Sequence, residues 1–125
     1  MFSCQTPELQ NSDRSLRTEW LECNGTGDYA SGTITGCNSR RYHGLLVANL
    51  DHIGRHVLLS GMEDWLVTEN GRIPLSSRKH PNAIYPDPSG SLKTFSASPY
   101  PTFVFEGPGF RLTRSLMLVR DRHTV

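Results

Sequence analysis

Short runs of β-branched and aromatic residues alternate with turn residues from about Thr33 to the end of the chain. No segment shows the 3.6-residue apolar period of an amphipathic helix, so these runs are predicted to be strands. Short strands at this spacing, without long helices between them, are typical of a β-sandwich rather than of βαβ units. The sequence therefore predicts an all-β fold, an antiparallel β-sandwich.

One run is apolar at every position. The residues from Leu45 to Ala48, LLVA, show no polar alternation, which predicts a strand that is covered on both faces and therefore central in its sheet. Upstream of it, glycines at positions 25, 27, 32 and 36 favour tight turns. We expect a shaped loop that leads into a central strand.

Two hairpins follow from the turn residues. Residues 64–68 and 73–75 flank Asn70-Gly71, the preferred pair for a type I′ turn, and Pro74 predicts an edge position or an early end to pairing. Residues 103–106 and 110–119 flank Gly107-Pro108-Gly109 and predict the second hairpin, in which Arg114 interrupts an apolar face and is expected to reach out of it.

The remaining segments are less regular. Prolines punctuate residues 76–101 and predict a long surface loop with one strand near 92–97. Residues 1–18 are polar and predict a loosely held leader, so the domain is expected to span residues 19–125. The β-branched pair Thr124-Val125 is expected to begin another strand, which predicts a domain that is incomplete at its C-terminus.

Composition limits the classes of partner. The formal net charge of +1 gives no basic footprint for nucleic acid or for a membrane, and neutral partners such as sugars fit better. Three cysteines without a C-x-x-C pair, and no signal-like apolar N-terminus, favour a cytoplasmic location. His52 and His56 have the spacing of paired metal ligands, but Gly54 between them argues against the helix that this spacing needs, so no metal is predicted.

A weak nucleotide-binding pattern is rejected for a physical reason. Residues 25–30 fit G-x-G-x-x-A, and Asp51 follows about 20 residues later, as in dinucleotide-binding proteins. A phosphate cradle needs the N-terminus of a helix, whereas residues 31–36 form helices poorly, and Asp28 would repel a pyrophosphate. No cofactor is predicted.

The most specific pattern begins at residue 19 and carries a family resemblance. It consists of Glu19-Trp20-Leu21, Asn24-Gly25, Gly27, Tyr29-Ala30-Ser31-Gly32-Thr33 and residues 38–48, NSRRYHGLLVA. It resembles the N-terminal domain of the bacterial and archaeal type of glycogen debranching enzyme, an amylo-α-1,6-glucosidase. Residues 54–60, 63–65 and 95–105 agree with that domain in the same order. With this resemblance we expect a supersandwich-like arrangement.

The resemblance implies that the chemistry lies elsewhere. In such enzymes a catalytic (α/α)6 helical barrel follows the β-rich domain, so the implied partners are that barrel and an α-glucan such as glycogen, limit dextrin or a maltooligosaccharide. Glycosidic hydrolysis needs two positioned carboxyl groups. The acidic residues show no spacing that singles out such a pair; they are chiefly Glu19, Glu22, Asp28, Glu63, Asp64 and Glu106. No catalytic residue is predicted, and the chain alone is expected to be inactive. A free-standing carbohydrate-binding or scaffold module is the alternative.

Candidate binding residues stand where polar sequence enters the apolar strand. Arg40, Arg41, Tyr42 and His43 combine planar donors with an aromatic ring, which suit the hydroxyl groups and the apolar face of a sugar. Strand alternation predicts that Arg41 and His43 point to one side and Arg40 and Tyr42 to the other. A purely structural role, in which these side chains hold the glycine-rich loop, is an equally weighted alternative. Trp20 and Trp65 are expected to be core residues.

Overall fold

The computed structural model describes residues 3–5 and 12–125. Two four-stranded antiparallel sheets form the body of the domain. Sheet A has the order β1 (Ser3–Gln5), β10 (Leu92–Ser96), β11 (Thr102–Gly107), β12 (Phe110–Ser115), and sheet B has the order β2 (Glu19–Cys23), β3 (Tyr29–Thr33), β4 (Gly44–Leu50), β5 (Gly54–Leu59). The sheets do not close into a barrel, and the predicted all-β, sandwich-like class is confirmed.

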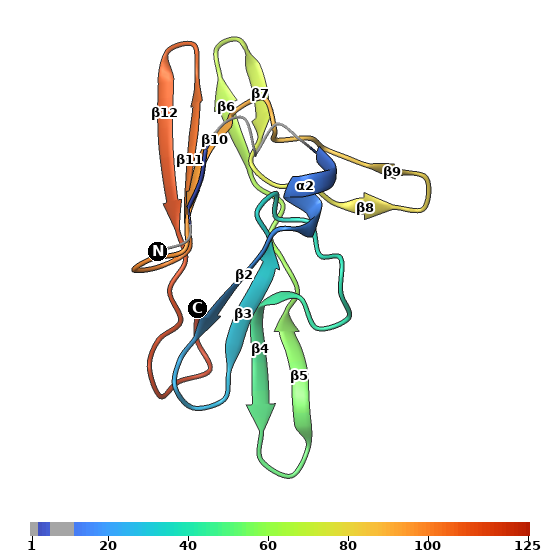
Figure 1. Cartoon of the computed structure of the whole chain (residues 1–125), viewed down its shortest axis with the longest axis vertical. Helices are drawn as coiled ribbons and strands as arrows, with labels where there is room; N and C mark the ends of the chain where they lie inside the picture. Colours follow the sequence, from blue (N-terminus) through green and yellow to red (C-terminus); the bar gives the residue numbers. More distant parts are fainter. Residues whose placement is uncertain (1–2, 6–11) are drawn as a thin grey trace.

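Two small hairpins and a short helix complete the described elements. They are β6 (Trp65–Thr68) with β7 (Gly71–Pro74), β8 (Lys79–His80) with β9 (Ala83–Ile84), and α2 (Ser12–Arg17). Both hairpins project from the body of the molecule, and α2 lies beside the end of β3 (Figure 1). The described part of the chain is therefore an open arrangement of hairpins around one packed centre.

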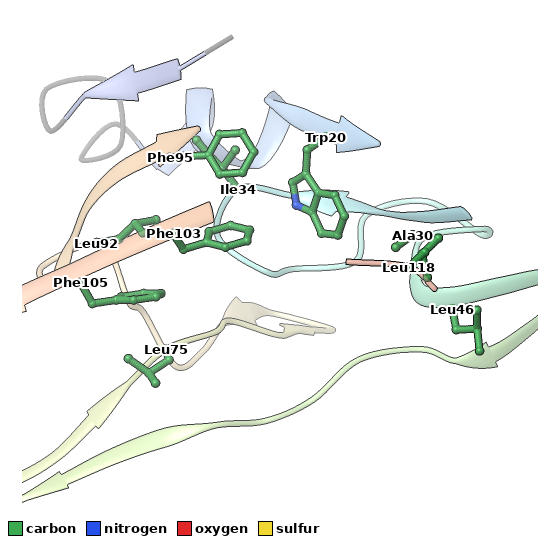
Figure 2. Packing of buried hydrophobic residues seen from close by; sticks show 10 residues of the cluster. All are labelled: Trp20, Ala30, Ile34, Leu46, Leu75, Leu92, Phe95, Phe103, Phe105 and Leu118. Atoms are coloured by element: carbon green, nitrogen blue, oxygen red, sulfur yellow. The ribbon is translucent and has the colours of Figure 1, made fainter. Parts of the chain in front are cut away.

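That centre joins the two sheets (Figure 2). Trp20 of sheet B meets Phe103 of sheet A edge to face, with ring centroids 6.2 Å apart, and Phe95 lies 5.0 Å from Phe103. The buried cluster comprises Trp20, Ala30, Ile34, Leu46, Leu75, Leu92, Phe95, Phe103, Phe105 and Leu118. Truncating a buried phenylalanine of this kind costs about 3–5 kcal/mol, so Phe103 is a principal link between the sheets.

The sequence predictions for the central strand and for Trp20 fit this architecture, whereas the prediction that Trp65 is a core residue is wrong. β4 lies between β3 and β5, and Val47 and Ala48 have no exposed surface. Trp20 is buried, as expected, whereas Trp65 is only partly buried at the start of β6. Pro74 is the last residue of β7, as its missing N–H predicts.

The first hairpin turns one residue earlier than predicted. Thr68 pairs with Gly71, so Glu69 and Asn70 connect the strands, in place of the predicted Asn70-Gly71 pair. Gly71 has a φ of +125°, a conformation that its missing Cβ permits. The glycine therefore opens the second strand instead of closing the turn.

Arg114 also departs from its predicted position. Instead of reaching out of the sheet, its guanidinium lies over Phe103 and Phe105, 4.8 and 5.4 Å from their ring centroids. It also pairs with Asp64 at 2.5 Å. Its cross-strand partner is Phe103, so the side chain is on the core-facing side, where the aromatic rings and a carboxylate compensate its charge.

The ends of the predicted elements differ as well. Ser3–Gln5 pair with β10, and α2 lies within the segment that was expected to be loosely held, so this part of the leader has regular structure. β12 ends at Ser115, before the predicted residue 119. Thr124 and Val125 form no strand in the described structure; instead the Thr124 carbonyl accepts a hydrogen bond from Val119.

A buried polar cluster, the Asp28 hub, holds the β2–β3 loop to the C-terminal segment. The Asp28 side chain is 1% exposed, and its carboxylate accepts hydrogen bonds from Asn49 N at 2.9 Å, Asn24 Nδ2 at 3.2 Å and His123 Nδ1 at 2.5 Å. Asn24 Nδ2 also donates to the Arg122 carbonyl at 3.2 Å. Because other residues of the domain supply the hydrogen bonds to the Asp28 carboxylate, the hub stabilises the fold.

Candidate functional site

Arg40, Arg41, Tyr42 and His43 lie in a turn that precedes β4. The backbone N–H of His43 donates to the Arg40 carbonyl at 3.2 Å, and β4 begins only at Gly44. The predicted strand alternation of these residues is therefore wrong: the chain must reverse before it joins the sheet. Arg40, Arg41 and Tyr42 are exposed, and His43 is buried, with 5% of its surface exposed.

Gly44, the first residue of β4, packs closely against the neighbouring strand β5. A Cβ at this position would lie 3.0 Å from the Leu59 carbonyl oxygen and 3.0 Å from Val57 Cγ1, both in the neighbouring strand β5. A side chain here would force the backbone of Leu59 to shift by a few tenths of an ångström, so glycine favours this close approach. The turn of residues 40–43 therefore joins β4 at a point where β4 and β5 approach each other closely.

All four predicted residues line one open hollow of about 510 Å³. The hollow lies beside β2, an edge strand of sheet B, and its other lining residues come from β2 and β3. They are Glu19, Trp20, Leu21, Tyr29 and Ser31. The structure thus brings the candidates together, although on a turn rather than on the two faces of a strand.

Glu19 is the charged centre of this hollow. The sequence alone does not single it out, because it resembles an ordinary acidic residue of the surface. Its Oε1 accepts a hydrogen bond from Arg40 Nε at 2.5 Å and lies 3.8 Å from His43 Nε2. The pairing joins the start of β2 to the turn before β4. No residue spacing signals it, because it depends on the register of three strands.

His43 is held in a defined tautomer. Its Nδ1 accepts a hydrogen bond from the backbone N–H of Ser39 at 3.1 Å, so the proton of the neutral ring is on Nε2, which faces Glu19. Burial lowers the pKa of His43, Glu19 opposes that change, and the Arg40 charge adds to it. The ring is therefore neutral at pH 7, and its charge does not add to that of the arginines.

A cation–π stack forms one wall of the site. The guanidinium of Arg41 lies 5.4 Å from the ring centroid of Tyr42, and that of Arg55 lies 5.3 Å from Tyr42 and 5.6 Å from Tyr29. Tyr29 Oη also donates to the Tyr42 carbonyl at 3.2 Å. Tyr29 and Arg55, which sequence analysis did not select, therefore hold the turn against the sheet. The two guanidinium groups compete with a sugar for the faces of the Tyr42 ring.

Other candidates in the sequence do not assemble into a site. His52 and His56 are both exposed on the β4–β5 hairpin, and the described residues contain no cluster of three or more groups that could hold a metal. Residues 25–30 lead into β3, without the helix that a nucleotide phosphate requires. No helix among the described residues has the length and apolar character to cross a membrane.

A second hollow, of about 590 Å³, lies between α2 and the β8–β9 hairpin. Its lining includes Asp13, Lys79, His80 and Asp87, but none of the predicted binding residues. We therefore assign the candidate site to the hollow that holds Glu19 and residues 40–43.

The comparison with protein families identifies the family of this domain. The model of the family described as glycogen debranching enzyme N terminal matches residues 18–125. The chain belongs to this family. The predicted resemblance is thereby confirmed over almost the same residues, so the hollow is a feature of a debranching-enzyme N-terminal domain. Neither the search of curated proteins nor the search of solved structures found a match.

Proposed function

We propose that this domain is the non-catalytic N-terminal part of a cytoplasmic glycogen-debranching glycoside hydrolase that acts on α-1,6-glucosidic branch points. In this proposal a helical (α/α)6 domain of the same enzyme supplies the two catalytic carboxyl groups. The β-domain supports that catalytic site, and its hollow contacts the α-glucan. Family membership carries the assignment to a debranching enzyme.

The observation that supports a contact with the glucan is that residues 40–43 line one hollow. The hollow offers the exposed Arg41 guanidinium, which lies over the Tyr42 ring, as a donor and the Glu19 carboxylate as an acceptor. A planar hydrogen-bond donor and a planar acceptor match the hydroxyl groups of a pyranose, which both accept and donate hydrogen bonds. No described residue accepts a hydrogen bond from the Arg41 guanidinium, so its donors remain for a ligand.

The experiment is Arg41→Ala in the full-length enzyme. We expect kcat/KM on branched limit dextrin to fall by more than about tenfold, equivalent to ~1.4 kcal/mol of transition-state binding, with little change in melting temperature. Arg120→Ala, at an exposed arginine outside the hollow, is the matched control. A drop in melting temperature with normal kinetics per folded molecule would assign Arg41 to structure alone.

The alternative, a free-standing carbohydrate-binding or scaffold module, needs only the hollow that this chain already contains. The gene sequence beyond Val125 separates the two proposals. A following helical barrel with paired acids supports the debranching enzyme, and a stop codon supports the free-standing module.

A further inference from the structure

The Glu19 carboxylate has unused hydrogen-bonding capacity at the hollow. Both of its close polar contacts, with Arg40 Nε and His43 Nε2, are made by Oε1. No described residue donates to the second oxygen, Oε2, and the side chain is 32% exposed. An ionised carboxylate accepts hydrogen bonds but cannot donate them. A ligand that meets Glu19 must therefore bring a donor.

Arg41 makes the opposite demand. Its guanidinium is exposed and lies over Tyr42, and as a permanent cation it donates hydrogen bonds but cannot accept them. Because both residues line the same hollow, a ligand that contacts both must donate at one position and accept at another. The hydroxyl groups of a sugar do both, since each hydroxyl carries one donor and two acceptor sites.

Anionic ligands fit this pair poorly. A phosphate dianion could accept from Arg41, but the negative charge of the Glu19 carboxylate would repel it. The neutral His43 ring adds no further positive charge, and Arg40 is already paired with Glu19 at 2.5 Å. The donor and acceptor pattern, rather than the number of arginines, therefore sets the ligand class.

We propose that Glu19 is a sugar-binding residue that accepts a hydrogen bond from a glucan hydroxyl through Oε2, and that Arg40 is a positioning residue that acts through Glu19. This inference rests on the proposed contact between the hollow and an α-glucan. The Arg40 Nε–Glu19 Oε1 bond holds the carboxylate in one orientation, so less conformational freedom is lost when the sugar binds.

The first experiment titrates maltoheptaose into the 125-residue chain and follows binding by calorimetry and by amide signals in two-dimensional NMR. Wild-type signals of Glu19 and Arg41 should shift, and Glu19→Gln should weaken binding by at least about fivefold, because a hydrogen bond to a charged group is lost. The matched control is Glu106→Gln, which removes another carboxylate paired with an arginine, Arg111, on the β11–β12 hairpin. That variant should bind as the wild type does.

The outcomes separate the two proposals. If the wild type binds maltoheptaose but Glu19→Gln binds equally well, or if the shifted amides lie outside the hollow, the role of Glu19 is refuted while glucan binding stands. If the wild type does not bind maltoheptaose at millimolar concentration, the proposed glucan contact is refuted, and the role of Glu19 with it. Binding of inorganic phosphate that maltoheptaose displaces would refute the assigned ligand class.

A double-mutant cycle tests Arg40. Arg40→Gln should weaken maltoheptaose binding in the wild-type background but have almost no effect in the Glu19→Gln background, because its contribution passes through Glu19. A merely structural role would not produce this dependence. Equal losses in the two backgrounds would mean that Arg40 contacts the sugar directly, and would overturn its positioning role. Denaturation midpoints of all variants, measured in parallel, show that each one is folded.

Discussion

The Asp28 hub and the Glu19 hollow are both built around a carboxylate, Asp28 in the β2–β3 loop and Glu19 at the start of β2, yet they use it in opposite ways. At the hub, Asn24, Asn49 and His123 all donate to a carboxylate that is almost completely buried. At the hollow, the polar contacts of Glu19 with Arg40 and His43 converge on one oxygen, and the side chain is partly exposed. A satisfied carboxylate fixes the fold, whereas one with free acceptors on an open surface is available to a ligand.

The hub provides the largest predicted effect. Asp28→Ala should lower the free energy of unfolding by about 3 kcal/mol, because the buried Asn24 amide would lose its acceptor and the Asn49 N–H and the His123 ring would lose their shared partner. Urea denaturation of the 125-residue chain measures this change. Asp51→Ala, an exposed aspartate on the β4–β5 turn, is the control and should shift stability by less than about 0.5 kcal/mol. Equal losses for the two variants would remove the contrast between a buried hub and a surface acid.

Sequence reasoning identified the hollow but not the hub, for a physical reason. Apolar and turn patterns predict which segments become strands, so β4, the hairpins and residues 40–43 could be found from the chain alone. The pairing of Glu19 with Arg40, and of Asp28 with His123, depends on strand register and on the path of the C-terminal segment. Neither leaves a local pattern in the sequence.

Two side-chain orientations differ from those that the sequence predicts. Strand alternation would extend back from β4 over residues 40–43, but the backbone hydrogen bond from His43 to Arg40 turns the chain first. Arg114 was expected to avoid an apolar face, but cross-strand pairing places it over the Phe103 ring, with Asp64 as its counter-charge. A local turn therefore overrides strand alternation at residues 40–43, and tertiary contacts place the Arg114 side chain against an apolar face.

His43 supplies a smaller effect that depends on pH. Burial lowers the pKa of the folded His43 below its ordinary value of 6.5, so the unfolded chain takes up the proton first as pH falls. The contribution of His43 to stability is therefore fully present above about pH 6.5 and is lost as pH falls toward the folded pKa. We expect the stability of the wild type to decrease more than that of His43→Asn between pH 7.5 and pH 5.5, in buffers of about 0.1 M ionic strength.

The choice of asparagine makes this comparison specific. Its Oδ1 can take the place of Nδ1 and accept the hydrogen bond from Ser39 N, so the turn keeps this contact while losing its titratable group. Equilibrium denaturation at each pH gives the difference in stability between the two proteins. A difference that stays constant with pH would show that the His43 ring does not titrate differently in the folded and unfolded states.

The smallest predicted effect on stability is that of Glu19→Gln, and it completes the comparison with the hub. Arg40 is 71% exposed, so solvent screens the Glu19–Arg40 pair, and its loss should cost about 0.5 kcal/mol or less. The same urea denaturation that measures Asp28→Ala checks this. A loss near that of Asp28→Ala would make Glu19 a second structural hub, and its free oxygen would then be incidental. A small loss in stability, together with weakened maltoheptaose binding, would mean that the open carboxylate contributes to recognition while the buried one contributes to the fold.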